Sequence, residues 1–90
     1  MKISSENPNQ SAITTNYVME QNHDITYVSY DEEGDWQFMS DDPFDEENAM
    51  VVSIKQILEK DKTLLTLPNI RKNEAYERKN KKSPWVKSTD

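Results

Sequence analysis

The chain has no cysteine among its 90 residues, and it has only one glycine and one histidine. Without cysteine it can form neither a disulfide framework nor a thiolate metal site. A secreted domain this small normally needs such cross-links, so we expect a cytoplasmic location. One glycine cannot build a glycine-rich phosphate-binding loop. No apolar run approaches the roughly 20 residues that span a bilayer, so we expect no membrane partner.

Apolar residues are also scarce, at 33% of the chain. A chain of this length buries only about 60–65% of the surface that it exposes when unfolded, so its core is thin. Two Trp, four Tyr and two Phe nevertheless provide large side chains for burial. Both ends are polar. We therefore expect a flexible N-terminus at 1–11, a single domain at 12–87 and a C-terminal tail at 88–90.

The clearest structural signal is a β-hairpin over residues 25–39. In Ile25–Tyr30, five of six residues are β-branched or aromatic, which strands favour. Gly34 marks the turn, because glycine accepts a positive φ without steric cost. Trp36 and Phe38 alternate onto the same face of the second strand, which predicts that both are core residues.

Shorter signals predict the other elements. Thr14 and Thr15 can cap a short helix over 16–21, and a helical turn is expected after Pro43. Residues 49–61 fit either one long amphipathic helix or a strand followed by a helix. Ser53 and Gln56 have the spacing of a capping box, which favours a strand at 49–52 and a helix at 54–61.

These elements together predict an α+β fold. We expect a small antiparallel sheet, made of the hairpin 25–39 and strands near 49–52 and 74–79, packed with two or three short helices. Trp85 stands in a charged C-terminal stretch, and leaving its ring in water would forfeit about 25 cal/mol per Å² of apolar area. We therefore predict that Trp85 packs back onto the domain as a third core aromatic.

Charge is distributed unevenly along the chain, whose net charge is −6. Residues 71–87 hold seven bases and two acids, a net charge of +5. Residues 31–47 hold nine acids and no base, and we take these acids as the candidate partner-binding residues. They are Asp31, Glu32, Glu33, Asp35, Asp41, Asp42, Asp45, Glu46 and Glu47. The alternative interpretation is two solvated surfaces that serve only solubility.

The residues do not form a catalytic or cofactor-binding pattern. His23 has neither a second histidine nor a cysteine with which to bind zinc or activate a nucleophile. The acids lie in a run beside a turn, whereas acid–base catalysis needs two carboxyls in distinct environments. Asp31–Asp35 also departs from the EF-hand pattern, with Asp42 where the final Glu should stand. We expect no cofactor, no metal and no catalytic residue.

Several strings in the chain jointly resemble a family of small uncharacterised bacterial proteins, a domain of unknown function. The most specific is Asp35-Trp36-Gln37-Phe38 after the 25–29 strand, and the resemblance spans roughly residues 12–87. It also includes Ile13-Thr14-Thr15, Glu46–Val52, Ile57-Leu58 before Lys60-Asp61, Leu67-Pro68 and Ser83-Pro84-Trp85-Val86. After Leu67-Pro68 the family carries a Gly-Trp or Gly-Tyr pair, whereas this chain has Asn69-Ile70-Arg71.

That family is similar to groups described as immunity-protein-like, found near bacterial toxin genes. The resemblance implies a binding protein without catalytic residues. We therefore expect a non-enzymatic module that binds a protein partner through its acidic surface, in its concrete form an immunity protein for a cationic toxin domain. The alternatives are a housekeeping or regulatory protein that forms a homodimer and, least favoured, a hydrolase. The acidic balance disfavours nucleic acid as the partner, despite the basic C-terminal stretch.

Overall fold

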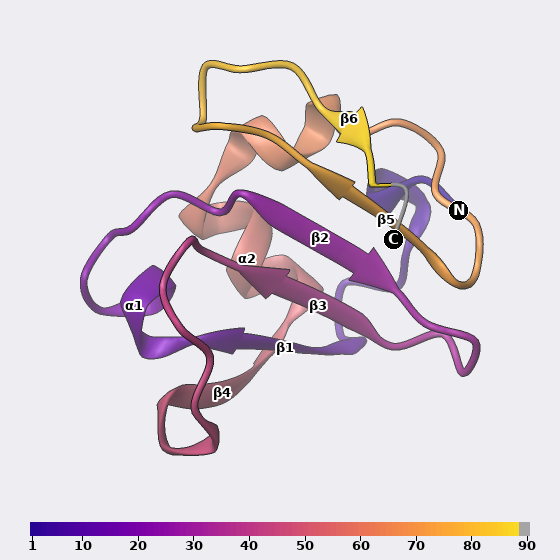
Figure 1. The fold of residues 1–90 in the computed structure, drawn as a ribbon. Helices are drawn as coiled ribbons and strands as arrows, with labels where there is room; N and C mark the ends of the chain where they lie inside the picture. The colour runs from indigo at the N-terminus through magenta and orange to yellow at the C-terminus, as the bar shows by residue number, and fades with distance from the viewer. Residues whose placement is uncertain (89–90) are drawn as a thin grey trace.

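The computed structural model describes residues 1–88, which form one six-stranded sheet with the strand order β4-β1-β3-β2-β5-β6 (Figure 1). The strands are β1 (Ser11–Thr15), β2 (Tyr27–Tyr30), β3 (Trp36–Met39), β4 (Ala49–Ser53), β5 (Glu74–Glu77) and β6 (Val86–Lys87). The chain also has two α-helices, α1 (Asn16–Met19) and α2 (Ile54–Lys60). Its three 3-10 turns are η1 (Ile3–Ser5), η2 (Glu46–Asn48) and η3 (Lys62–Thr66). The predicted α+β class is confirmed.

The predicted hairpin is present, with β2 antiparallel to β3. Gly34 has a φ of 85°, and its N–H donates to the carbonyl of Asp31 at 3.0 Å, which closes the turn. Trp36 and Phe38 are both 0% exposed, as predicted, and their rings stack with centroids 5.9 Å apart. The alternation along β3 therefore fixes which face of the sheet holds the core.

The prediction of an antiparallel sheet is wrong, because it missed β1. This strand lies inside the sheet, parallel to β3 and antiparallel to β4. Its polar residue Thr14 is fully buried, and its hydroxyl donates to the carbonyl of Phe38 at 2.7 Å. Burial of a hydroxyl is tolerated when such a bond satisfies it. The predicted cap is confirmed at Thr15, whose side chain accepts the N–H of Val18.

The N-terminal segment, expected to be flexible, packs against the domain in this structure. Ile3 is 1% exposed and belongs to the main hydrophobic cluster. Glu6 accepts the indole N–H of Trp36 at 3.0 Å. The polar composition of this segment led to the wrong prediction because two single residues hold it: the Ile3 side chain fills core volume, and the Glu6 carboxylate accepts the buried indole N–H of Trp36.

The predicted break between strand and helix is confirmed at Ser53. The Ser53 hydroxyl accepts the N–H of Gln56 at 3.1 Å, and the Gln56 amide oxygen accepts the N–H of Ser53 at 2.8 Å. This capping box starts α2, which buries Ile54 and Ile57. The predicted turn after Pro43 is shorter than expected, since only η2 is helical.

The C-terminal part differs from the prediction in two ways. The strand expected at 74–79 ends at Glu77, because Glu77 pairs with Tyr27, the first residue of the partner strand β2. A short strand, β6, then pairs with β5, and the N–H of Ser88 donates to the carbonyl of Ala75 at 2.8 Å. The predicted tail at 88–90 therefore begins with an anchored residue, while 89–90 lie outside the described residues.

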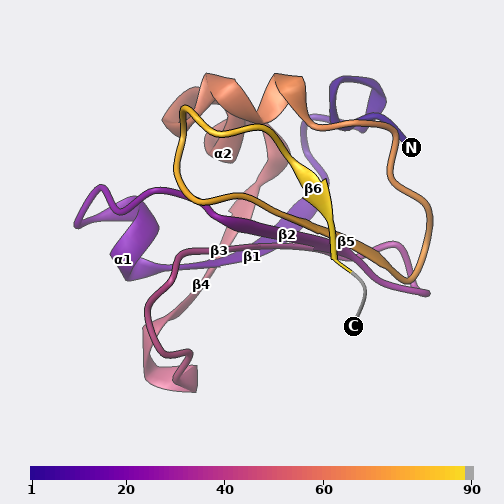
Figure 2. The same cartoon turned by 45° about the horizontal axis from the view of Figure 1, so that its top comes forward.

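One face of the sheet is covered and the other is open. Figure 2 shows α2 and the helical turn after it on one side, while the connection from β3 to β4 projects on the opposite side. On the open face, Val51 is 74% exposed and Val86 is 60% exposed. The open face and the projecting connection therefore lie on the same side of the molecule.

Candidate functional site

The two acidic segments lie at opposite ends of the β2–β3 hairpin. Residues 31–35 form the turn that joins the two strands, whereas residues 40–48 leave β3 at its other end (Figure 1). The expectation that both segments build one acidic surface is therefore corrected by the topology. Whether either segment binds a partner stays a prediction.

In the hairpin turn, the acidic side chains divide into one that holds the turn and three that are exposed. The Asp31 carboxylate accepts the N–H groups of Glu33 and Asp35, each at 2.9 Å. The side chains of Glu32, Glu33 and Asp35 are exposed. Asp31 therefore has a local structural role, as aspartate often does in turns.

In the second segment, three acids are tied to the fold. Asp41 accepts the hydroxyl of Thr26 at 2.7 Å, and Asp45 caps η2 by accepting the N–H of Glu47 at 3.1 Å. Asp42 is held by two side chains. Within residues 1–88, the carboxylates of Glu46 and Glu47 make neither a hydrogen bond nor an ion pair, and both residues are exposed. These two acids are the free charges of the segment.

Asp42 joins a serine and a histidine. Its Oδ2 atom lies 2.7 Å from Nδ1 of His23 and accepts the Ser40 hydroxyl at 2.5 Å. These bonds, first the one from His23 and then the one from Ser40, lower the pKa of Asp42. Nucleophilic catalysis would need the serine to bond the imidazole, but here both contact the same carboxylate. The arrangement therefore fixes the connection after β3 and does not activate the serine.

The open face of the sheet is built from side chains that alternate away from the core. The strand register places Tyr27 beside Met39 on one side and Glu77 on the other, with Val86 next to Glu77. Toward the other edge, Ile13 pairs with Val51. This face mixes apolar side chains with polar ones such as Gln37 and Ser29, and its exposed valines are candidates for contact with another molecule.

A groove of about 870 Å³ opens at the end of this face, where β2 begins and β3 and β5 end. Its walls include Tyr27, Met39, Asp41, Glu77, Pro84 and Val86. A smaller hollow beside it is lined by His23 and Asp42 and shares Thr26 and Asp41 with the groove. The groove combines apolar walls with the carboxylates of Asp41 and Glu77. The sequence did not predict that these residues lie together. Among residues 1–88, no cluster of three or more His, Asp or Glu side chains could hold a metal ion.

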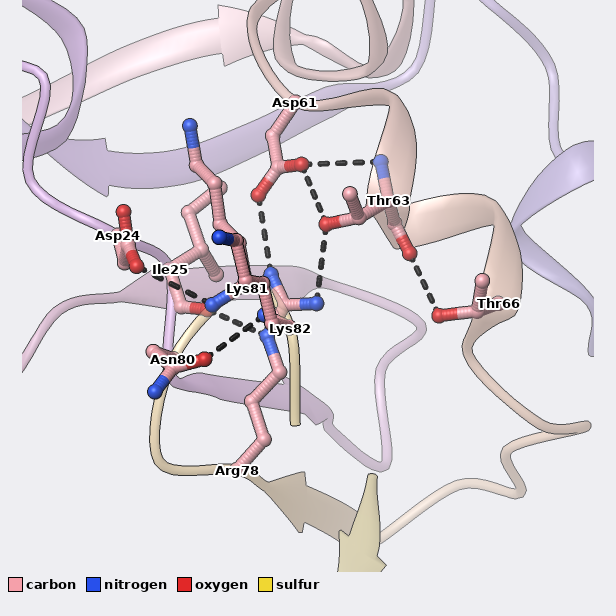
Figure 3. A network of polar contacts seen from close by, with 9 residues as sticks. All are labelled: Asp24, Ile25, Asp61, Thr63, Thr66, Arg78, Asn80, Lys81 and Lys82. Atoms are coloured by element: carbon pink, nitrogen blue, oxygen red, sulfur yellow. Dashed lines mark hydrogen bonds and ion pairs between the residues drawn. The ribbon is translucent and has the colours of Figure 1, made fainter. Parts of the chain in front are cut away.

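A buried polar network supports one end of the groove (Figure 3). The guanidinium of Arg78 donates to the carbonyl of Ile25 at 2.9 Å, to the hydroxyl of Thr63 at 2.9 Å and to Asp61 at 3.0 Å. It also lies 4.1 Å from the centre of the Trp85 ring. Burial lowers the pKa of Arg78, whereas the nearby Asp61 carboxylate opposes this effect. The arginine stays charged in either case.

This network confirms part of the prediction for Trp85. The ring is half-buried and packs against the core cluster, so it is not free in solvent, but it is not a fully buried core residue. Its contact is with Arg78, one of the seven bases of the C-terminal stretch 71–87. The signal that could have found Arg78 is its position, because it follows β5 directly and continues the core-facing alternation of Tyr76.

No known family model, curated protein or solved structure matches the chain. The resemblance to the small bacterial family therefore gains no support from these comparisons and stays a hypothesis. Within residues 1–88, no helix is long and apolar enough to cross a membrane.

Proposed function

We propose that this chain is a non-enzymatic, cytoplasmic binding module whose partner is a basic protein. The observation that carries the proposal is the open sheet face, where Val51 and Val86 are 74% and 60% exposed. Phe44, in the connection that projects on the same side, is 55% exposed. Val51 and Val86 lie on the two edge strands, β4 and β6, so exposed apolar side chains occur at both edges of the face, and charged residues lie beside them. Exposed apolar side chains next to charged ones are a common combination at protein interfaces.

The charge beside this face sets the kind of partner. Glu46 and Glu47 are exposed in the projecting connection, and Asp41 and Glu77 line the groove. Complementary charges accelerate the association of proteins and disfavour partners of like charge. A cationic protein domain fits this surface best. An immunity protein for a cationic toxin domain is the concrete form of the proposal, and it depends on the family resemblance.

The test is capture of partners from the native host, followed by association kinetics with matched variants. The double variant Glu46→Gln/Glu47→Gln removes two charges beside the open face. The control, Glu32→Gln/Glu33→Gln, removes the same two charges from the hairpin turn at the other end. We expect the first variant to slow association with the captured protein at low salt, and the control to leave it unchanged. Equal effects would contradict the proposal.

One observation favours a second candidate, a regulatory homodimer. The N–H of Ile54 donates to the carbonyl of Gln10, just before β1, whereas the N–H of Ser53 donates to the Gln56 side chain. Alternate residues of an edge strand direct their backbone groups toward and away from the neighbouring strand, so the backbone groups of Val51, like those of Ser53, point away from β1. β4 is one of the two edge strands and carries no charged residue, and uncharged edges can pair with a second copy. Sedimentation velocity at increasing concentration decides between the two, since Val51→Lys should dissolve such a dimer.

A further inference from the structure

We propose that the groove at the end of β2, β3 and β5 is a pocket for an arginine side chain of the protein partner. This inference rests on the proposed function in one respect only, that the partner is a protein. The groove lies where four neighbouring strands, β3, β2, β5 and β6, run side by side (Figure 1). Tyr27, Met39, Glu77 and Val86 line it from these paired strands, which suits a preformed binding site.

The walls fit the aliphatic part of a long side chain. Met39, Tyr27 and Val86 line the groove from three strands, and Pro84 lines it from the segment before β6. None of these residues is fully buried, so their apolar surfaces are available. Long basic side chains lay their methylene groups along apolar surface of this kind while the charged end reaches a polar partner.

The charged groups favour a cation. Asp41 and Glu77 both line the groove. Thr26 donates to one Asp41 oxygen, and the second oxygen makes no hydrogen bond within residues 1–88. Glu77 is exposed and forms no ion pair in the described part of the chain. Two carboxylates thus have unused acceptor capacity at one site.

The basic residues of the groove do not cancel this charge. Arg78 is already neutralised by Asp61, with Nη2 and Oδ2 3.0 Å apart, and its side chain is only 1% exposed. Lys79 is the one further base among the lining residues, against the two carboxylates. The groove therefore has a net negative charge, which raises the local concentration of cationic groups.

Arginine fits better than lysine for two reasons. The guanidinium is planar and can stack on an aromatic ring, and the aromatic residue Tyr27 is among the residues that line the groove. Its five donors can bond more than one acceptor, and both Asp41 and Glu77 line the groove. Lysine carries a compact, strongly hydrated charge that loses more on entering an apolar groove.

The test is an NMR titration of the isotope-labelled full chain with N-acetyl-arginine methylamide. We expect saturable shifts of the amides of Tyr27, Met39 and Glu77. The citrulline analogue has the same shape without the charge, and we expect no saturation with it. Glu77→Gln should weaken arginine binding by about threefold to fivefold, the effect of one exposed ion pair. The matched control Glu59→Gln, on α2, should not change it.

Each alternative outcome overturns the inference. Equal binding of citrulline would mean that the groove does not recognise a cation. Equal or tighter binding of the lysine analogue would exclude arginine selectivity. Shifts centred on residues 31–35 would indicate diffuse attraction to acids. A melting scan of Glu77→Gln tests that any loss of arginine binding is not caused by unfolding.

The two proposals can fail separately, because the titration needs no partner. Failure to capture a protein contradicts only the proposed function, whereas a captured protein whose binding is unchanged by Glu77→Gln contradicts only the pocket.

Discussion

Nη2 of Arg78 lies 3.0 Å from Oδ2 of Asp61, and the two side chains are only 1% and 3% exposed. The pair joins the end of β5 to the residue that ends α2 and caps η3. Asp61 also accepts the N–H and the hydroxyl of Thr63, at 2.9 and 2.5 Å. Every polar group of the pair is thus bonded, which is what a buried ion pair requires in a core this small.

Arg78→Met should lower the free energy of unfolding by about 3–5 kcal/mol, because it leaves the Asp61 carboxylate buried without its counter-charge. Urea denaturation measures this loss. Lys79→Met is the control, since Lys79 is the exposed neighbour and should change stability by no more than about 0.5 kcal/mol. A loss below about 1 kcal/mol for Arg78→Met would mean that the buried carboxylate is neutralised in another way.

Trp36→Ala should lower the free energy of unfolding by about 3–5 kcal/mol, as aromatic truncations in cores do. Trp36 is 0% exposed, it packs on Phe38 and Tyr30, and its indole N–H bonds Glu6, so the substitution leaves a cavity and an unpaired acceptor. Chemical denaturation followed by circular dichroism tests this. Val51→Ala, at a residue 74% exposed, serves as the comparison and should be close to neutral.

Trp85→Ala should lower the melting temperature at both low and high salt. The ring packs on the core cluster and on the Arg78 guanidinium, 4.1 Å away. Such a contact contributes about 0.5–2 kcal/mol, and most of it is not screened because the guanidinium is buried. Deleting residues 80–90 should have at least the same effect. A truncated protein that melts like the parent would show that the C-terminal stretch does not support the domain.

Lys87→Gln should raise the pKa of Glu74 toward its ordinary value. In the parent, the bond from Lys87, whose Nζ lies 2.6 Å from Oε2, is the main cause that lowers the pKa of Glu74. A lowered folded-state pKa contributes stability above the unfolded pKa of about 4.5, and this is lost as pH falls through the folded value. Carboxyl NMR titration of both proteins measures the shift. Identical Glu74 titrations would contradict the ion pair.

The elements that the sequence predicts well are those whose signals are local. The hairpin needs only Gly34 and the alternation around Trp36, and the start of α2 needs only Ser53 and Gln56. β1 was missed because Thr14 and Thr15 are polar. The Thr14 hydroxyl can be buried because it donates a hydrogen bond to the carbonyl of Phe38, 24 residues later. No short window of sequence contains that information.

The candidate site divides in the same way. The acids themselves are visible in the sequence, and their separation follows from the hairpin, because a turn and the far end of its strand cannot meet. The groove is different. It depends on the pairing of β5 with β2 and of β6 with β5, which brings Glu77 and Val86 beside Tyr27. The pairing of β5 with β2 joins Tyr27 to Glu77, which are far apart in the sequence, so it is set by tertiary packing and not by local preference.

The interior position of β1 has a consequence for the order in which the chain folds. β1 is made first during synthesis, yet both of its neighbours, β3 and β4, come later. Its parallel pairing with β3 cannot form through a tight turn, so a loop must close before any contact repays the lost chain entropy. The hairpin can form alone and early, whereas β1 is not paired on both sides until β4, which ends at Ser53, is available. We therefore expect closure around β1 to limit the folding rate, as non-local strand pairing does.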